Sequence, residues 1–111
     1  MPTEDQSILV LVRDLLFSSK ITATASAVGA KIQLLSDPQQ LAAHSGAKLI
    51  VDLNQPAALD AAARWKQSTG GRVVGFVSHV DTATIDRARE LGIDEILPRS
   101  RFVQVLPDLL N

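Results

Sequence analysis

The stretch KLIVDLNQP, residues 48–56, sets an apolar run against an acid and a polar turn. The three residues before Asp52 are aliphatic, as is typical of a strand that is covered on both faces. Asp52 interrupts the run, and Asn54 and Pro56 follow as residues that favour turns. A carboxylate at the end of a buried strand either forms the turn or takes part in chemistry.

Similar apolar runs recur along the chain, and they alternate with longer segments of helical periodicity. The apolar runs predict strands over 7–12, 31–36, 48–53, 71–78 and 94–98. The segments between and after them predict helices over 17–29, 38–45, 56–69, 82–91 and 100–111. In the first of these helices, apolar residues recur every three or four positions from Phe17 to Val28, which marks one buried face.

Helix boundaries are indicated by capping residues and breakers. Gly29 is placed to end the first helix. Asp37 and Pro38 predict the N-cap and the first position of the second helix, and Gly46 lies past its end. Pro107 has no backbone N–H to donate, so we expect the last helix to be irregular.

Five strand–helix units with short connections require parallel crossovers. We therefore predict a single domain over 1–111, of class α/β, in which helices cover both faces of one five-stranded parallel sheet. The flavodoxin-like strand order 2-1-3-4-5 is the first choice, with a three-layer sandwich as the result.

Composition and motifs narrow the function classes. With a formal net charge of -1, the chain has no overall electrostatic attraction to nucleic acid or to an anionic membrane. The absence of cysteine rules out disulfides and thiol chemistry. No apolar run approaches the ~20 residues that span a bilayer, and the polar N-terminus is unlike a secretory signal, so we expect a soluble cytoplasmic protein. No phosphate-binding glycine loop or nucleophile elbow occurs, which predicts that the chain is not an enzyme.

Side chains that can carry chemistry follow four of the five predicted strands. They are Arg13, Asp14, Asp52, Asn54, Ser78, His79 and Arg99. Because the carboxyl ends of parallel strands meet at one edge of a sheet, we expect these side chains to converge there. Ser18, near the start of the first predicted helix, could help to hold an anion at that helix's N-terminus. Simple capping and turn formation would also explain Ser18 and Asp52, so both readings stay open.

Three segments, taken in order, resemble the receiver domain of bacterial response regulators. VDLNQP is similar to the family's phosphoacceptor segment, with Asp52 matching the acceptor and Pro56 the proline four residues on. VVGFVSH is similar to the fourth strand, with Ser78 at the switch hydroxyl. RARELGIDEILPR is similar to the run that leads to an essential lysine, and Arg99 stands at the lysine position. The resemblance covers nearly the whole chain and implies a phosphoacceptor-like Asp52 with switch-like Ser78 and Arg99.

The chain also departs from that family. Receivers end their first strand with two acids that hold a magnesium ion, whereas Val12 and Arg13 stand at those positions here and Asp14 follows one residue later. Magnesium requires oxygen ligands in near-octahedral geometry, and arginine does not replace the compact charge of lysine. We expect Arg13 and Arg99 to neutralise Asp14 and Asp52 directly. This predicts no metal and no cofactor, with Asp14 and Asp52 as magnesium ligands only if the receiver site functions.

Two functions from different classes follow. The first is an atypical receiver-like (pseudo-receiver) module of two-component or phosphorelay signalling, which lacks the full magnesium and phosphorylation site and acts through protein–protein contacts. Its partner would be a histidine kinase or a downstream regulator, and a homodimer could form through the face from Thr82 to Leu110. The alternative is a stand-alone domain that binds a small ligand or anion, with Arg13, Ser18, Ser78 and Arg99 at its rim.

Overall fold

The computed structural model of the chain, which describes residues 7–78 and 81–110, contains one sheet of five parallel strands. The strands are β1 (Ile8–Leu11), β2 (Ile32–Leu35), β3 (Lys48–Asp52), β4 (Arg72–Val77) and β5 (Glu95–Pro98). Their order is β2-β1-β3-β4-β5, which confirms the predicted topology. The reversal of strand order falls between β1 and β3, whose carboxyl ends are where ligands gather in open α/β sheets.

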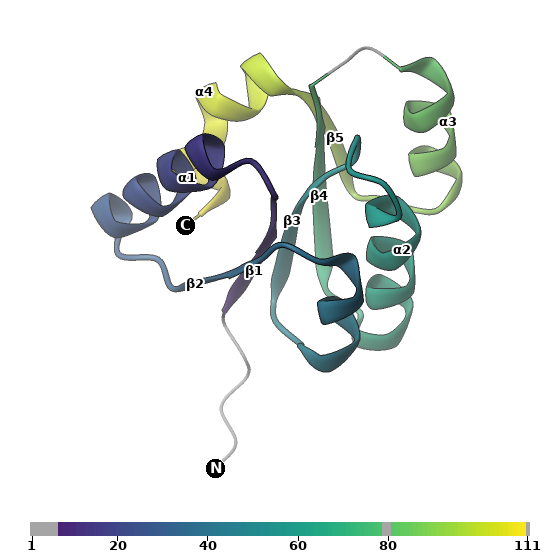
Figure 1. Ribbon diagram of the computed structural model, residues 1–111, viewed down its shortest axis with the longest axis horizontal. Coiled ribbons are helices and arrows are strands. Elements are labelled where there is room, and N and C mark those ends of the chain that lie inside the picture. Colours follow the sequence, from purple (N-terminus) through teal and green to yellow (C-terminus); the bar gives the residue numbers. More distant parts are fainter. Residues whose placement is uncertain (1–6, 79–80, 111) are drawn as a thin grey trace.

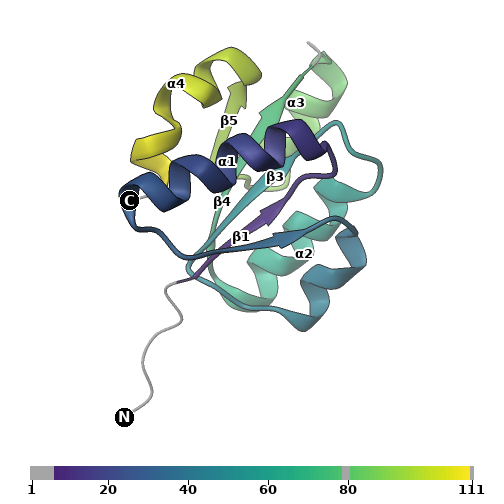
Figure 2. The ribbon, with the colours of Figure 1, turned by 60° about the vertical axis from the view of Figure 1, so that its left-hand side comes forward.

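Helical segments cover both faces of this sheet (Figures 1 and 2). They are α1 (Leu15–Val28), the 3₁₀ helix η1 (Pro38–Ala43), α2 (Ala58–Thr69), α3 (Thr82–Glu90) and α4 (Arg99–Leu109). The core is accordingly split in two. Strand residues such as Val10, Ile50 and Val74 pack with α1 and α4, whereas Leu9, Val51 and Val73 belong to the cluster under η1, α2 and α3. None of the helices in the described part of the chain is long and apolar enough to cross a membrane.

The ends of α1 are set by local chemistry. Asp14 is its N-cap, because one carboxylate oxygen accepts hydrogen bonds from the backbone N–H groups of Leu16 and Phe17. Gly29 closes the helix in the left-handed conformation, with φ of 73°, as its position in the sequence predicts. The predicted apolar face is buried at Phe17, Ile21 and Ala25. The helix begins two residues before the predicted Phe17, because the cap is Asp14.

The second crossover differs from prediction in type and length. Its start is as expected, with Asp37 as N-cap, a capping box to Gln40 and Pro38 at the first position. The segment is a 3₁₀ helix, however, and it ends at Ala43. Only a short connection is available to return to the start of β3. Six residues span about 12 Å as a 3₁₀ helix but about 9 Å as an α-helix. The 3₁₀ form therefore carries the chain further, which suits a segment that has few residues left to reach the start of β3.

The carboxylate of Asp94, the residue just before β5, makes hydrogen bonds at the amino edge of the sheet. Asp94 accepts hydrogen bonds from the backbone N–H of Val73 at 2.7 Å and from the Lys66 Nζ at 2.8 Å. Partial burial is the largest single influence on the pKa of Asp94, and on its own it would raise that pKa. The hydrogen bonds from Lys66 and Val73, with the charges of Lys66 and Arg72, outweigh it and hold the pKa below its ordinary value.

We predict that Asp94→Asn lowers the free energy of unfolding by about 1 kcal/mol at neutral pH, since the side chain is 26% exposed and its ion pair is partly screened. A depressed pKa stabilises the fold above the unfolded-state pKa, and that contribution is lost as pH falls through the folded-state value. The difference between wild type and variant should therefore shrink as pH drops below about 5. Urea unfolding at a series of pH values measures this; a difference that stayed constant to low pH would contradict it.

Candidate functional site

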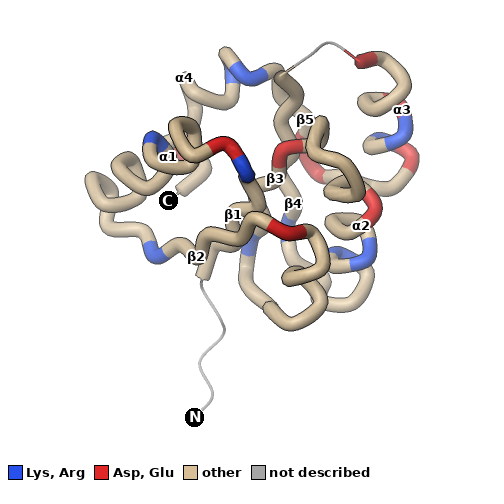
Figure 3. Tube along the Cα trace, viewed as in Figure 1, with Lys and Arg blue, Asp and Glu red and all other residues tan. Residues whose placement is uncertain are grey.

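An open cavity of about 300 Å³ lies at the carboxyl edge of the sheet. Six of the side chains predicted to converge there line it: Arg13, Asp14, Asp52, Asn54, Ser78 and Arg99. They come from the ends of β1, β3, β4 and β5, so the parallel sheet brings together residues that are up to 86 positions apart, from 13 to 99. Figure 3 shows the acids and bases at this edge as neighbouring red and blue segments near the start of α1 and the end of β3. His79 lies outside the described residues.

Asp14 and Arg99 form the ion pair of this cavity. The Asp14 Oδ2 lies 3.6 Å from the Arg99 Nη2, while Oδ1 of the same carboxylate caps α1. The guanidinium also lies over the ring of Phe17, 4.1 Å from its centroid, which favours a cation–π contact. Both charged side chains are more than 40% exposed, so the pair contributes at most about 1 kcal/mol to stability. The pair matters because Arg99 engages the second oxygen of the Asp14 carboxylate.

Asp52 forms the turn after β3. Its Oδ1 accepts a hydrogen bond from the backbone N–H of Asn54 at 3.0 Å, and the residue is half-buried. The Asn54 Oδ1 in turn accepts from the backbone N–H of Ser78 at 2.6 Å. This chain of contacts ties the loop after β3 to the end of β4. Turn formation by Asp52 is thus present in the structure.

Ser18 is placed away from the cavity, because it is not among the lining residues. Its side chain is buried and its hydroxyl donates to the carbonyl of Leu15 at 3.1 Å. The first N–H groups of α1 are bonded to Asp14 instead of being open to an anion. The two residues after Asp14, Leu15 and Leu16, are 80% and 86% exposed, which is unusual for large apolar side chains.

Several lining residues were not singled out from the sequence. Phe17 and Phe76 form an apolar floor, and both are less than 5% exposed. Gln55 is buried as well, and its Nε2 donates to the carbonyl of Ser36, which anchors the loop after β3 to the end of β2. Ala57 adopts φ of 66°, a left-handed conformation that costs a non-glycine residue about 1 kcal/mol. The alternation within GFVS was the available signal for Phe76, since it places residues 76 and 78 on the same face.

Neither a family model nor a curated protein matches the sequence. Among solved structures, the phosphorylated cyanobacterial phytochrome response regulator RcpA is similar with a TM-score of 0.81 and 13% identity, over 95% of this chain and 91% of that one. A receiver domain from Clostridium thermocellum is similar with a TM-score of 0.79 and 20% identity, over 96% and 91%.

A third similar structure, a response regulator from Burkholderia pseudomallei, carries a phosphorylated aspartic acid and a calcium ion. It has a TM-score of 0.79 and 18% identity, over 96% of this chain and 67% of that one. The five-stranded order and the helices on both faces define a flavodoxin-like α/β protein. Within that class, the chain has the fold of response regulator receiver domains.

Proposed function

We propose that the chain is a receiver-like signal-transduction module that works by protein contact and lacks the complete magnesium and phosphorylation site of receivers. The observation that carries this proposal is the position of the Asp14 carboxylate. One of its oxygens accepts two backbone hydrogen bonds at the start of α1, and the other faces the Arg99 guanidinium. The acid best placed to assist Asp52 is therefore already engaged.

The donor set of the cavity does not fit a magnesium ion. Magnesium needs several oxygen ligands in octahedral positions, usually including one or two carboxylates free to bind it. Residues 7–78 and 81–110 contain no group of three histidines, cysteines or acids that could hold a metal. Two guanidiniums, those of Arg13 and Arg99, line the same cavity and would repel a dication. Without the cation, charge that develops on a transferring phosphoryl group is poorly neutralised.

The surface offered to a partner would be the one formed by α3, β5 and α4, which spans the predicted Thr82–Leu110 face. In Figure 1, β5 lies between α3 and α4 at one side of the molecule. Apolar side chains of this region, including Ile85, Ile96 and Val103, are only partly buried. Such a surface suits a histidine kinase, a downstream regulator or a second copy of the chain in the cytoplasm. Ile96 replaces the aromatic that often serves as a switch in receivers, which favours a module that is not switched by a rotamer relay.

Binding of a small anion at the rim is the second candidate function. It is favoured by one observation: Arg13, Arg99 and Ser78, whose side chains carry hydrogen-bond donors, line the same cavity of about 300 Å³. In this case the cavity would hold a phosphate or carboxylate without a metal. The two candidates share the cavity but differ in what enters it.

A magnesium titration followed by amide resonances of ¹⁵N-labelled protein tests the main proposal. We expect the resonances of Asp52, Asn54 and Ser78 to stay in place up to millimolar magnesium, because the carboxylates are engaged and the guanidiniums oppose the ion. Saturable shifts at these residues that disappear in Asp52→Asn would contradict it. A parallel titration with inorganic phosphate separates the second candidate, which requires shifts centred on the same residues without any cation.

A further inference from the structure

The two edges of the sheet differ in how they are protected. β5 begins with Glu95, which is paired with Arg72 at 2.6 Å, and it ends with Pro98, which has no N–H to donate. Charged residues and proline are common means by which an edge strand avoids pairing with another chain. β2, at the other edge, has the sequence IQLL, with neither a charge nor a proline. This edge therefore lacks both protections.

The hydrogen bonds of β2 show which of its backbone groups point away from β1. The carbonyls of Lys31 and Leu35 accept from backbone N–H groups of β1 and of the residue after it. Because carbonyls alternate in direction along a strand, Ile32 and Leu34 direct theirs outward, together with their N–H groups. The next outward residue, Ser36, is already bonded through both groups to glutamine side chains. Among the described residues β2 pairs only with β1, so the outward groups of Ile32 and Leu34 have no strand partner.

Leu34 gives this edge an apolar side chain that is 47% exposed. Its register partner in β1 is Val10, which belongs to the cluster under α1 and α4, so Leu34 lies on the same face of the sheet. α1 itself carries a single charged residue, Lys20, among its fourteen. A neighbouring molecule at this edge would therefore meet an apolar side chain beside a helix of low charge.

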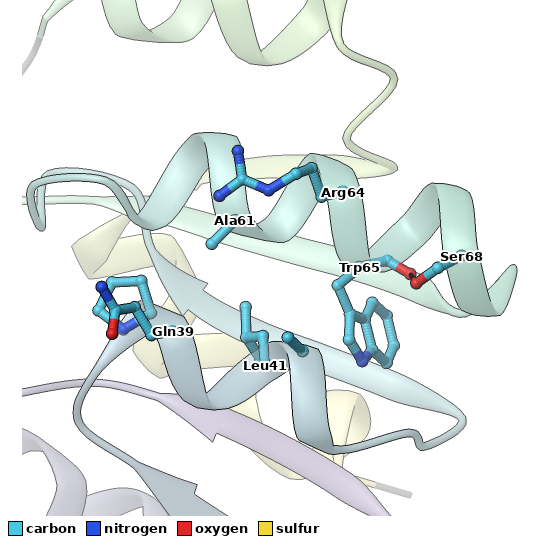
Figure 4. A pocket seen from close by; sticks show the side chains of 8 residues that line it. Gln39, Leu41, Ala61, Arg64, Trp65 and Ser68 are labelled. Carbon is cyan, nitrogen blue, oxygen red and sulfur yellow. Dashed lines mark hydrogen bonds between the residues drawn. The ribbon is translucent and has the colours of Figure 1, made fainter.

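The crossover that follows β2 turns toward α2. η1 packs on α2, and Leu41 and Trp65 are 2% and 3% exposed between these two helices (Figure 4). Gln33 of β2 pairs in register with Leu9, which places it on the η1 face of the sheet, and its side chain is exposed. The edge of β2 is thus accessible on both faces.

We propose that β2 pairs with β2 of a second copy of the chain, antiparallel and centred on Gln33. In that register Ile32 of each copy lies opposite Leu34 of the partner copy, and each such pair exchanges two N–H···O=C hydrogen bonds. The pairing uses all the outward groups of Ile32 and Leu34, and it covers the exposed leucine. A register centred on Leu34 would instead require Ser36, whose backbone groups are already bonded.

A second copy fits this edge better than an isolated extended peptide. Two-fold symmetry brings α1 of both copies to the same face of the joined sheet, and each helix adds only the charge of Lys20. The formal net charge of -1 adds little repulsion between copies. A standard interface buries about 800 Å² on each side, so a strand contact of this length gives a weak dimer. The edge lies across the sheet from β5, and the proposal does not depend on the function proposed above.

The chain has no cysteine, so one introduced thiol reports the pairing. In the proposed register the two Gln33 residues form a non-hydrogen-bonded pair with Cα atoms about 4.5 Å apart, a separation that a disulfide can bridge. The two Leu34 residues are diagonal neighbours about 7–8 Å apart. With copper phenanthroline in air, we expect Gln33→Cys to form a linked dimer at least about tenfold faster than Leu34→Cys or Leu16→Cys, at the exposed start of α1. Equal rates for the three thiols would overturn the proposal.

Sedimentation equilibrium tests the contact without a cross-link, and circular dichroism checks that every variant is folded. Leu34→Pro removes an outward N–H that β1 does not use, so it should keep the fold and weaken the dimer at least about tenfold. Leu34→Ala keeps that N–H and should weaken the dimer less. Arg101→Glu, on the exposed side of α4, should have no effect. A chain that stays monomeric up to about 1 mM, or a dimer that Arg101→Glu dissociates and Leu34→Pro does not, would contradict the pairing.

Discussion

Replacement of Phe76 by alanine is expected to lower the free energy of unfolding by about 3–5 kcal/mol. Phe76 lies on β4 and is 1% exposed, and its ring centroid lies 4.6 Å from that of Phe102 and 5.0 Å from that of Phe17. The three rings join β4 to α4 and α1, so the variant removes the shared surface of three elements. Aromatic pairs of this kind stabilise the fold by about 0.5–1.5 kcal/mol beyond the contribution of the surface area that they bury.

Urea unfolding followed by circular dichroism measures this loss. Phe76→Leu is the control, because it keeps most of the buried volume and should lose about half as much or less. The same ring supports the rim cavity, since Arg99 lies over Phe17, the neighbour of Phe76. A loss below about 1 kcal/mol for the alanine variant would mean that the cluster is not packed as described.

Conversion of the rim toward the receiver pattern is expected to create magnesium binding. The double variant Arg13→Asp with Arg99→Lys changes a guanidinium at the end of β1 into a carboxylate and removes the fork that faces Asp14. Arg13→Asp replaces a positive charge with a negative one, which alters the Coulomb energy of a nearby dication by several kcal/mol before screening, even at an effective dielectric of ~20. Arg99→Lys keeps the positive charge and changes only the geometry of the cation. We expect the affinity for magnesium to rise by at least about tenfold over wild type.

Isothermal titration with magnesium chloride measures this gain, and calcium chloride provides a second cation of different size. Addition of Asp52→Asn to the double variant is the control, since it should remove most of the gained affinity if Asp52 takes part. An affinity that did not change in the double variant would show that the guanidiniums are not what opposes the cation.

The fold was largely predictable because its signals are local and redundant. Each strand is a continuous apolar run, and alternation of runs with helical segments leaves few topologies when crossovers must be right-handed. Gly29 ended its helix as expected, and the predicted apolar face of that helix is buried at Phe17, Ile21 and Ala25. The sequence did not distinguish a 3₁₀ helix from an α-helix in the second crossover, because Asp37 and Pro38 can begin either one.

The sequence predicted which residues gather at the candidate site, but not which of them contact one another. Strand ends place Asp14, Asp52 and Arg99 at one edge, and this follows from the parallel order alone. Which carboxylate meets which guanidinium depends on side-chain reach and capping, and the sequence does not encode these in a pattern. Arg13 and Arg99 were expected to neutralise Asp14 and Asp52. The Arg99 Nη2 lies 3.6 Å from the Asp14 Oδ2, and both side chains are more than 40% exposed.

The contact among Phe17, Phe76 and Phe102 could not be anticipated. These residues are 59 and 26 positions apart, and they meet only because α1 and α4 cover the same face. Contacts of this kind require the three-dimensional arrangement of whole elements.

The central claim is that Asp14 and Arg99 leave Asp52 without the cation that phosphoryl transfer needs. Intact-mass spectrometry after incubation with acetyl phosphate and magnesium tests it most directly, with Asp52→Asn as the matched control. The account predicts that wild type and the control remain unmodified alike, and that they give the same result with magnesium replaced by a chelator. A phosphoryl increment on wild type that requires magnesium and is absent from Asp52→Asn would contradict it.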